Sequence, residues 1–205
     1  MYALVTDGTI TKYFSYPKGF TLGDNQYPAD IFMKWSVAEK EAIGIYEVVF
    51  DNSNKKDEQW YINTNQSYAF ADGVVTATYG SATAKAHADT LFTAQDEIDE
   101  KGIEGEVATR GLKYNLIKTV KQQAANILQD TDWYIVRKAD ASTAVPSAIT
   151  THRAEVRTKA ATQETQITNA SDTPALETLY TYVNTGTEEN PVMERPLGEL
   201  PTLES

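Results

Sequence analysis

Residues 111–133 read GLKYNLIKTVKQQAANILQDTDW, and this stretch decides the fold. Its apolar side chains recur every four residues, and two further isoleucines widen the apolar stripe. Lysines and glutamines occupy most of the opposite side, and Asp130-Thr-Asp132 ends the periodicity before Trp133. The stretch therefore predicts an amphipathic helix. The stripe consists of Leu112, Leu116, Ile117, Val120, Ala124, Ile127 and Leu128.

A second, thinner apolar stripe follows Pro146 and Ser147, where proline suits the first turn of a helix. Two amphipathic helices joined by a short connection bury their stripes by folding back on each other. The stretch from Gly111 to Ala170 therefore predicts an antiparallel helical hairpin, with Trp133 packed near its bend. The second stripe consists of Ile149, Val156, Ala160, Gln163 and Ile167.

Two short motifs lie in this hairpin. Leu128-Gln-Asp-Thr-Asp-Trp133 ends the first helix, and His152-Arg-Ala-Glu-Val-Arg157 lies in the second. The pair resembles the small helical domain of bacteriophage tail-assembly and tail-fibre-assembly chaperone-like proteins. That domain combines a Leu-x-x-(Thr/Ser)-Asp-Trp helix end with a (Tyr/aromatic)-Arg-x-x-(Leu/Val)-Arg helix, and His152 stands where tyrosine is more usual. The opening, Met1 to Tyr13, is similar to the start of phage tail proteins that begin with an Asp-Gly hairpin.

The resemblance covers roughly half of the chain and implies association with a phage tail. It implies a protein made in the host cytoplasm and located in the tail of the virion. Its expected partners are other tail, baseplate or fibre proteins, and self-association into a homo-oligomer stays open. Two roles follow: a structural tail component, or an assembly chaperone that is absent from the finished particle. The second role matches the family, and we favour the first because of the added β module and the C-terminal tail.

The whole sequence predicts an α+β protein in four segments. Residues 1–80 form a small antiparallel β-rich module, and residues 81–106 form an acidic connector that contains the domain boundary. Residues 107–183 form the helical hairpin with a short third helix, which covers the open side of the hairpin. Residues 184–205 form an extended, acidic, proline-rich tail, which composition predicts to be flexible unless its own protein or another subunit holds it.

Local signals add detail to the first module. Asp7-Gly8 and Asp72-Gly73 stand between β-forming runs, and Asp-Gly favours the type I′ turn of a β-hairpin. Ser36 and Glu39 match a capping box and predict a short helix that ends before Gly44. Residues 15–30 are rich in proline, glycine and asparagine, and predict an irregular loop.

Charge and composition argue against several classes of function. The net charge is −11, but residues 107–170 hold 9 Lys or Arg against 5 Asp or Glu, whereas every other segment is acidic. Such a small basic region in an acidic protein does not favour nucleic-acid binding. The basic region either forms solvated helix faces or is a docking site for the acidic tail or for an acidic neighbouring subunit. No apolar run of membrane-spanning length and no signal-peptide pattern is present, so no membrane partner is expected.

The sequence does not predict an enzyme, a cofactor or a metal site. It contains no cysteine and two histidines, His87 and His152, in different segments. No phosphate-binding glycine loop or nucleophile motif is present. The acidic run of residues 96–102 lacks the ligand spacing of an EF-hand, and we interpret it as a surface turn or a helix start.

Six residues are candidates for protein–protein contacts. Trp133 and Tyr134 are either interface anchors or the core lock of the hairpin bend. Arg153 and Arg157 lie one helical turn apart, so they either face an acidic partner together or pair locally with Asp130, Asp132 or Glu155. Trp60 and Tyr61 belong to a group of aromatic residues too large for one small core, and they either pack inside or meet a partner.

Overall fold

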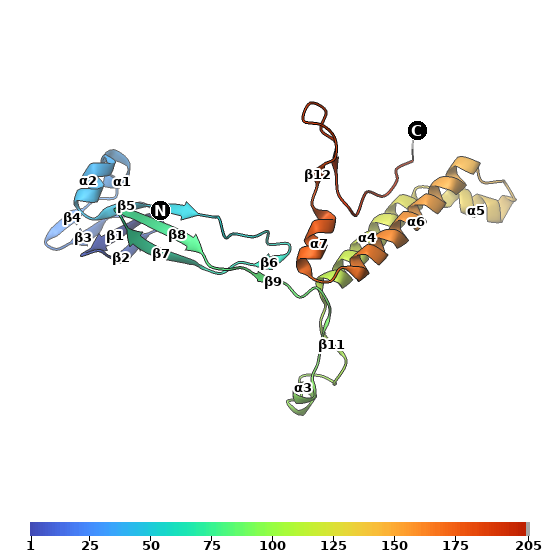
Figure 1. Ribbon diagram of the computed structural model, residues 1–205, viewed down its shortest axis with the longest axis horizontal. Coiled ribbons are helices and arrows are strands. Elements are labelled where there is room, and N and C mark those ends of the chain that lie inside the picture. The colour runs from blue at the N-terminus through green and yellow to red at the C-terminus, as the bar shows by residue number, and fades with distance from the viewer. Residues whose placement is uncertain (204–205) are drawn as a thin grey trace. The chain divides into compact units, whose positions relative to one another are not determined.

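The computed structural model describes residues 1–203 and confirms an α+β fold (Figure 1). The chain divides into two compact units, Met1–Thr83 and the remainder from Ala84. Strands dominate the first unit and helices the second. The two units are described separately.

The first unit is built on a five-stranded sheet in the order β2-β1-β5-β8-β7. Three of its four strand pairs are antiparallel, but β5 and β8 run parallel, so the sheet is mixed and not purely antiparallel. The parallel pair arises because the chain leaves β5, forms the edge strand β7 and returns in the original direction. The strands are β1 (Tyr2–Thr6), β2 (Thr9–Phe14), β5 (Ile45–Asp51), β7 (Gln66–Ala71) and β8 (Val74–Tyr79), and the two-residue strands β6 (Tyr61–Ile62) and β9 (Thr83–Ala84) lie outside this sheet.

Both Asp-Gly turns have the predicted geometry. Asp7 and Gly8 have φ values of 51° and 74°, and Asp72 and Gly73 have φ values of 50° and 77°. Two successive positive φ values are what a type I′ turn requires, and its twist matches that of the flanking strands. The turns therefore set the registers of β1 with β2 and of β7 with β8.

The segment 15–30 is not the irregular loop that its composition predicts. It contains a second hairpin, β3 (Phe20–Leu22) and β4 (Asn25–Tyr27), which turns at Gly23, and the helix α1 (Ile31–Lys34) follows. The predicted capping box is confirmed at α2 (Val37–Ala42), where the Ser36 backbone N–H donates to Glu39 Oε2 at 2.8 Å. The Ser36 hydroxyl in turn accepts the backbone N–H of Glu39.

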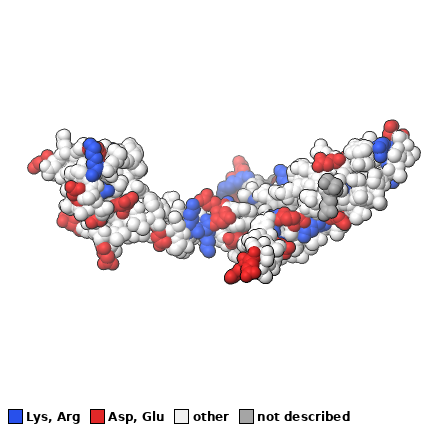
Figure 2. Space-filling view, turned by 90° about the horizontal axis from the view of Figure 1, so that it is seen from above, with Lys and Arg blue, Asp and Glu red and all other residues white. Residues whose placement is uncertain are grey.

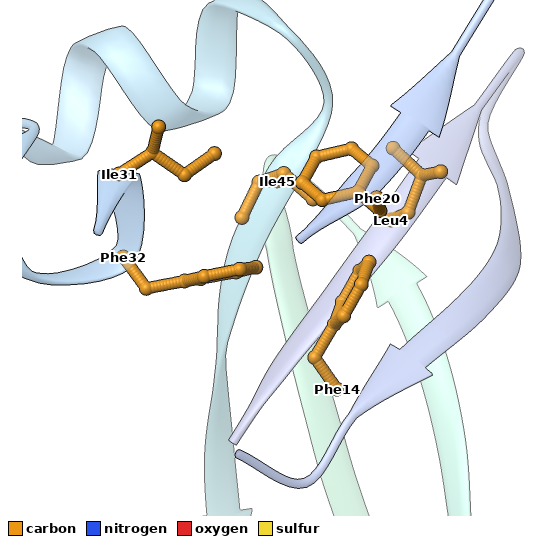
Figure 3. Close-up of a cluster of buried hydrophobic side chains, with 6 residues drawn as sticks. All are labelled: Leu4, Phe14, Phe20, Ile31, Phe32 and Ile45. Carbon is orange, nitrogen blue, oxygen red and sulfur yellow. The ribbon is translucent and has the colours of Figure 1, made fainter. Parts of the chain in front are cut away.

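Strand β1 is buried on both faces, since alternate residues of a strand point to opposite sides. Leu4 faces a cluster of aromatic and aliphatic side chains beneath α1 and the β3-β4 hairpin, whereas Ala3 and Val5 face the inside of the curled sheet. In the first cluster the Phe14 ring lies 5.0 Å from Phe20 and 5.2 Å from Phe32 between ring centroids (Figure 3). The first cluster consists of Leu4, Phe14, Phe20, Ile31, Phe32 and Ile45, and the second of Ala3, Val5, Val48, Val75 and Ala77.

The second unit contains the predicted helical hairpin. Helices α4 (Leu112–Gln129) and α6 (Ser147–Asn169) lie side by side, and an additional helix, α5 (Asp132–Ala141), occupies the bend (Figure 1). Helix α7 (Thr173–Tyr180) packs on α6 through Leu176, which is fully buried. The third helix thus ends before Val183, which lies in a strand. Other buried apolar residues of this unit include Val120, Ala124, Ile149, Val156, Ala160 and Ile167.

Two small hairpin-like additions complete the second unit. The segment predicted as an acidic connector contains β10 (Thr90–Leu91), α3 (Ala94–Ile98) and β11 (Val107–Thr109). The segment predicted as an extended tail begins with a hairpin of β12 (Val183–Asn184) and β13 (Met193–Glu194). Among the described residues, none of the helices has the length and apolar character needed to span a membrane.

The junction between α2 and β5 requires glycine at position 44. Gly44 has a φ of +78°, its carbonyl accepts the Val5 N–H at 2.8 Å, and an added Cβ would lie 2.3 Å from the Val5 carbonyl oxygen. Gly8 has a similar φ but open space around it, so it isolates the effect of φ alone.

We therefore expect Gly44→Ala to destabilise the first unit by more than Gly8→Ala. The left-handed conformation costs an alanine roughly 1–2 kcal/mol at either position, and the clash adds to this at Gly44. Urea unfolding followed by tryptophan fluorescence measures both variants. Equal losses of stability in the two variants would show that the contact with Val5 relaxes without cost.

Candidate interaction surfaces

Arg153 holds the bend of the helical hairpin. Its side chain is buried, and Nη1 donates to the Leu128 carbonyl at 2.7 Å and to the Thr131 hydroxyl oxygen at 2.6 Å. Nη2 lies 2.8 Å from Asp132 Oδ1. The last carbonyls of a helix lack partners within the helix, and a cation is favourable near that end. Arg153 on α6 therefore caps α4 across the hairpin.

This placement decides between the two interpretations of Arg153: the local pair with Asp132 is confirmed, and joint presentation of Arg153 and Arg157 to a partner is wrong. Arg153 is not presented to a partner, because its guanidinium is used inside the hairpin. Arg157 is exposed, and its Nη1 donates to the Arg153 carbonyl at 3.4 Å. The two side chains therefore do not form one basic surface, and only Arg157 stays a candidate for contact with an acidic partner.

Trp133 does not lock the bend. Half of its surface is exposed, because α5 starts at Asp132 and directs the indole ring outward. The ring centroid lies 3.8 Å from that of Tyr134, and the Arg137 guanidinium lies 4.7 Å from the Trp133 centroid and 5.7 Å from that of Tyr134. The two rings are tilted by 32° to each other, and a guanidinium this close to both ring centroids is attracted to them. The interpretation of Trp133 and Tyr134 as interface anchors stays a prediction.

None of the ten residues of α5 is buried. Trp133, Val136 and Arg137 lie on one side of the helix, and Tyr134 borders them, as the helical period of 3.6 residues requires. We call these four residues the α5 surface. Val136 is 65% exposed, and Ile135 on another side is 43% exposed. A short helix with large apolar side chains and no cover is characteristic of a docking element.

Trp60 and Tyr61 differ from each other. Trp60 is buried, which confirms the interpretation that it packs inside and contradicts its choice as a candidate for contact with a partner. It directly precedes the two-residue strand β6, where successive side chains point to opposite sides. Tyr61 is half-buried, with the Lys56 ammonium 6.0 Å from its ring centroid, and stays a candidate.

Residues 89–111 form a closed loop that we call the acidic excursion. Asp89 closes its base: Oδ1 accepts the Gly111 N–H at 2.8 Å, and Oδ2 lies 2.6 Å from Arg110 Nη1. The Gly111 N–H and the Arg110 side chain hold the pKa of Asp89 below its ordinary value. At the other end Ile98 and Ile103 are 74% and 58% exposed. The excursion extends away from α4 and α6 (Figure 1).

Some carboxylates of the excursion already have hydrogen-bond or ion-pair partners within it. Asp96 caps α3 by accepting hydrogen bonds from the Thr93 hydroxyl and N–H, and Lys101 lies 2.9 Å from Asp99. These contacts lower the pKa of Asp96 and of Asp99. Within residues 1–203 no group of three or more His, Cys, Asp or Glu side chains could hold a metal ion.

The C-terminal segment is docked on its own unit. Leu197 is buried, its N–H donates to the Leu179 carbonyl at 3.0 Å, and the Gln163 amide donates to the Gly198 carbonyl at 2.9 Å. Glu199 accepts hydrogen bonds from Tyr182 and Arg195. Burial raises the pKa of Glu199, but these two partners outweigh it and lower the pKa overall. Residues 195–199 of the tail are therefore anchored, mainly by an apolar side chain and backbone carbonyls, whereas residues 184–194 are exposed.

The basic residues of the hairpin do not gather in one patch on the face shown in Figure 2. There, lysine and arginine side chains alternate with acidic ones. Lys121 on α4 pairs with Glu164 on α6 at 3.3 Å. Part of the positive charge of residues 107–170 is therefore neutralised by an ion pair between the two helices.

No family model, curated protein or solved structure matches the chain. The candidate surfaces accordingly rest on the geometry of this chain alone.

The arginines provide a matched pair of variants. We expect Arg153→Met to destabilise the second unit by about 2–4 kcal/mol, because it leaves the end of α4 and Asp132 without their cation. Arg157→Met should change stability by less than about 0.5 kcal/mol, as is usual for an exposed side chain. Thermal unfolding followed by far-UV circular dichroism compares them. A stable Arg153→Met protein would contradict the capping role.

Proposed function

We propose that this chain is a structural protein of a bacteriophage tail, baseplate- or fibre-associated, that acts through protein–protein contacts at the α5 surface. The observation that supports the contact role is α5 itself, a helix of ten residues with none buried and with half of Trp133 exposed. The association with a phage tail is supported by the resemblance of the hairpin motifs. Trp133 is the last residue of the first motif, and so the motif leads directly into this surface.

The chemistry of the α5 surface suits a stable contact. Tryptophan, tyrosine and arginine are the residues that contribute most to binding at protein interfaces. Removing a large apolar side chain such as Val136 from water stabilises a complex by roughly 1.5–3 kcal/mol. Trp133, Tyr134 and Arg137 already contact one another in the single chain, and such mutual contacts lower the entropic cost of binding.

An assembly chaperone would use the same surface but would leave before the particle is complete. Mass spectrometry of purified particles, with copies counted against the major tube protein, separates the two roles. Stoichiometric presence supports the structural role. Absence from particles together with abundance in the infected lysate replaces it by the chaperone role.

A substitution tests the surface itself. We expect Trp133→Ala to reduce incorporation into particles by at least about 10-fold, as the loss of a central interface anchor does, while stability stays nearly unchanged. A side chain that is half exposed contributes little to folding, in contrast to a core tryptophan. Quantitative mass spectrometry of particles and thermal unfolding of the purified chain measure the two effects.

Tyr16→Ala is the matched control, because Tyr16 is a 63% exposed aromatic residue of the first unit. It should leave incorporation unchanged. Normal incorporation of Trp133→Ala would exclude the α5 surface as the contact, and a large loss of its thermal stability would exclude the exposed position.

A further inference from the structure

One face of helix α4 is exposed and carries a shallow, open hollow between its side chains, which we call the α4 groove. The groove has a volume of about 540 Å³, and all the residues that line it belong to α4. Tyr114 forms one end of it with 43% of its surface exposed, and the Arg110 guanidinium lies 4.3 Å from the centre of its ring. The lining residues are Tyr114, Ile117, Lys118, Lys121, Gln122 and Ala125.

The groove combines an apolar floor with positive charge. Ile117 is half-buried and Ala125 is exposed, whereas Lys118 and Lys121 provide ammonium groups at its rim. Lys121 is already paired with Glu164. Lys118 has no ion-pair partner within residues 1–203. The chemistry of this groove thus fits an occupant with apolar side chains beside carboxylates.

The tip of the acidic excursion has that chemistry. Residues 93–106 contain six Asp or Glu against one Lys, and they present Ile98 and Ile103 to solvent. Three of the carboxylates, those of Asp96, Glu97 and Asp99, already have partners within the excursion. The side chains of Glu100 and Glu104 are exposed and lack an ion-pair partner in the described part of the chain. The isoleucines of the tip can pack on the apolar side chains of the groove, while a free carboxylate pairs with the free ammonium group of Lys118.

We infer that two copies of this chain associate by exchanging their acidic excursions, each packing Ile98 and Ile103 against the α4 groove of the other. The base of the excursion, closed by Asp89 and Arg110, directly precedes α4. Within one chain the excursion points away from the helices (Figure 1). A second copy is therefore the occupant that fits.

A two-fold axis allows both contacts to form at once. Residues 114–125 lie about 5–20 Å along α4 from Gly111, at 1.5 Å per residue. The groove and the excursion of one copy thus start from the same junction. In a two-fold arrangement the same patch faces itself, so every contact between excursion and groove occurs twice. The interface closes on itself and gives a dimer without open ends.

Sedimentation of the full chain tests this arrangement. We expect a dimer at high micromolar concentration whose dissociation constant rises when salt is raised from about 50 mM to about 500 mM, because salt screens the rim charges. Lys118→Glu alone and Glu100→Lys alone should each weaken the dimer by at least about 10-fold, since each places like charges across both symmetric contacts. The combined variant, with both charges reversed, should dimerise again.

The control is Lys138→Glu on α5, which changes the net charge by the same amount as Lys118→Glu outside the groove. It should leave the dimer unchanged. A chain that stays monomeric at all concentrations overturns the proposal, and so does a dimer that neither single variant weakens. Failure of the combined variant to recover also overturns it, provided that its circular dichroism matches the parent chain. None of these outcomes bears on the α5 surface, so the two proposals are tested separately.

Discussion

The second unit depends on the position of a single cation, the guanidinium of Arg153. A helix of 18 residues ends with carbonyl groups that lack partners, and in α4 this end lies at the bend of the hairpin. Arg153 reaches it from α6 and contacts the Leu128 carbonyl, the Thr131 hydroxyl and the Asp132 carboxylate. Burying a cation is costly unless its donors find acceptors. Both Nη atoms of Arg153 have them, whereas its Nε has no hydrogen-bond partner within the described residues. The motif Leu128–Trp133 provides all three acceptors, namely the Leu128 carbonyl and the side-chain oxygens of Thr131 and Asp132.

This capping explains why the aromatic residues after the motif are free. If apolar side chains closed the bend, Trp133, the largest residue of the motif, would be expected to be buried there. Because the polar contacts of Arg153 close the bend, the chain can start a new helix at Asp132 and turn the indole ring outward. Because a buried cation closes the bend, a large apolar side chain stays available for contact with other molecules.

The sequence predicted those features that depend on neighbouring residues. The Asp-Gly turns, the capping box at Ser36 and the stripes of the two long helices are local, and each has a direct physical cause in a few adjacent side chains. The parallel pairing of β5 with β8 depends on residues far apart in the chain, and nothing within either strand specifies it. The β3-β4 hairpin was not predicted, because strands of three residues are too short to show a clear alternation of apolar and polar side chains.

The candidate site was predicted only in part, for a related reason. Periodicity predicted that Arg153 lies on the second helix, but it could not show that α4 would end beside it. The sequence alone therefore could not tell whether Arg153 caps a helix inside the protein or binds a partner at the surface. The pair Thr131-Asp132 was the available signal, since two acceptors at a helix end call for a donor from elsewhere. The sequence left core packing and partner contact open for Trp60, because aromatic content does not determine which face of a short strand is covered.

The two candidate surfaces of the second unit are built from different residues of one helical hairpin. The base of the excursion lies at the N-terminus of α4, the groove runs along α4 from Tyr114 to Ala125, and the α5 surface begins beyond the C-terminal residue Gln129. At 1.5 Å per residue, the base of the excursion at Gly111 lies about 27 Å from Gln129, whereas the far end of the groove lies about 6 Å from it. The two surfaces therefore share no residue, although the groove approaches the end of α4 where α5 follows. Such an arrangement suits a protein that joins a copy of itself along a rigid helix and a different partner beyond its C-terminal end.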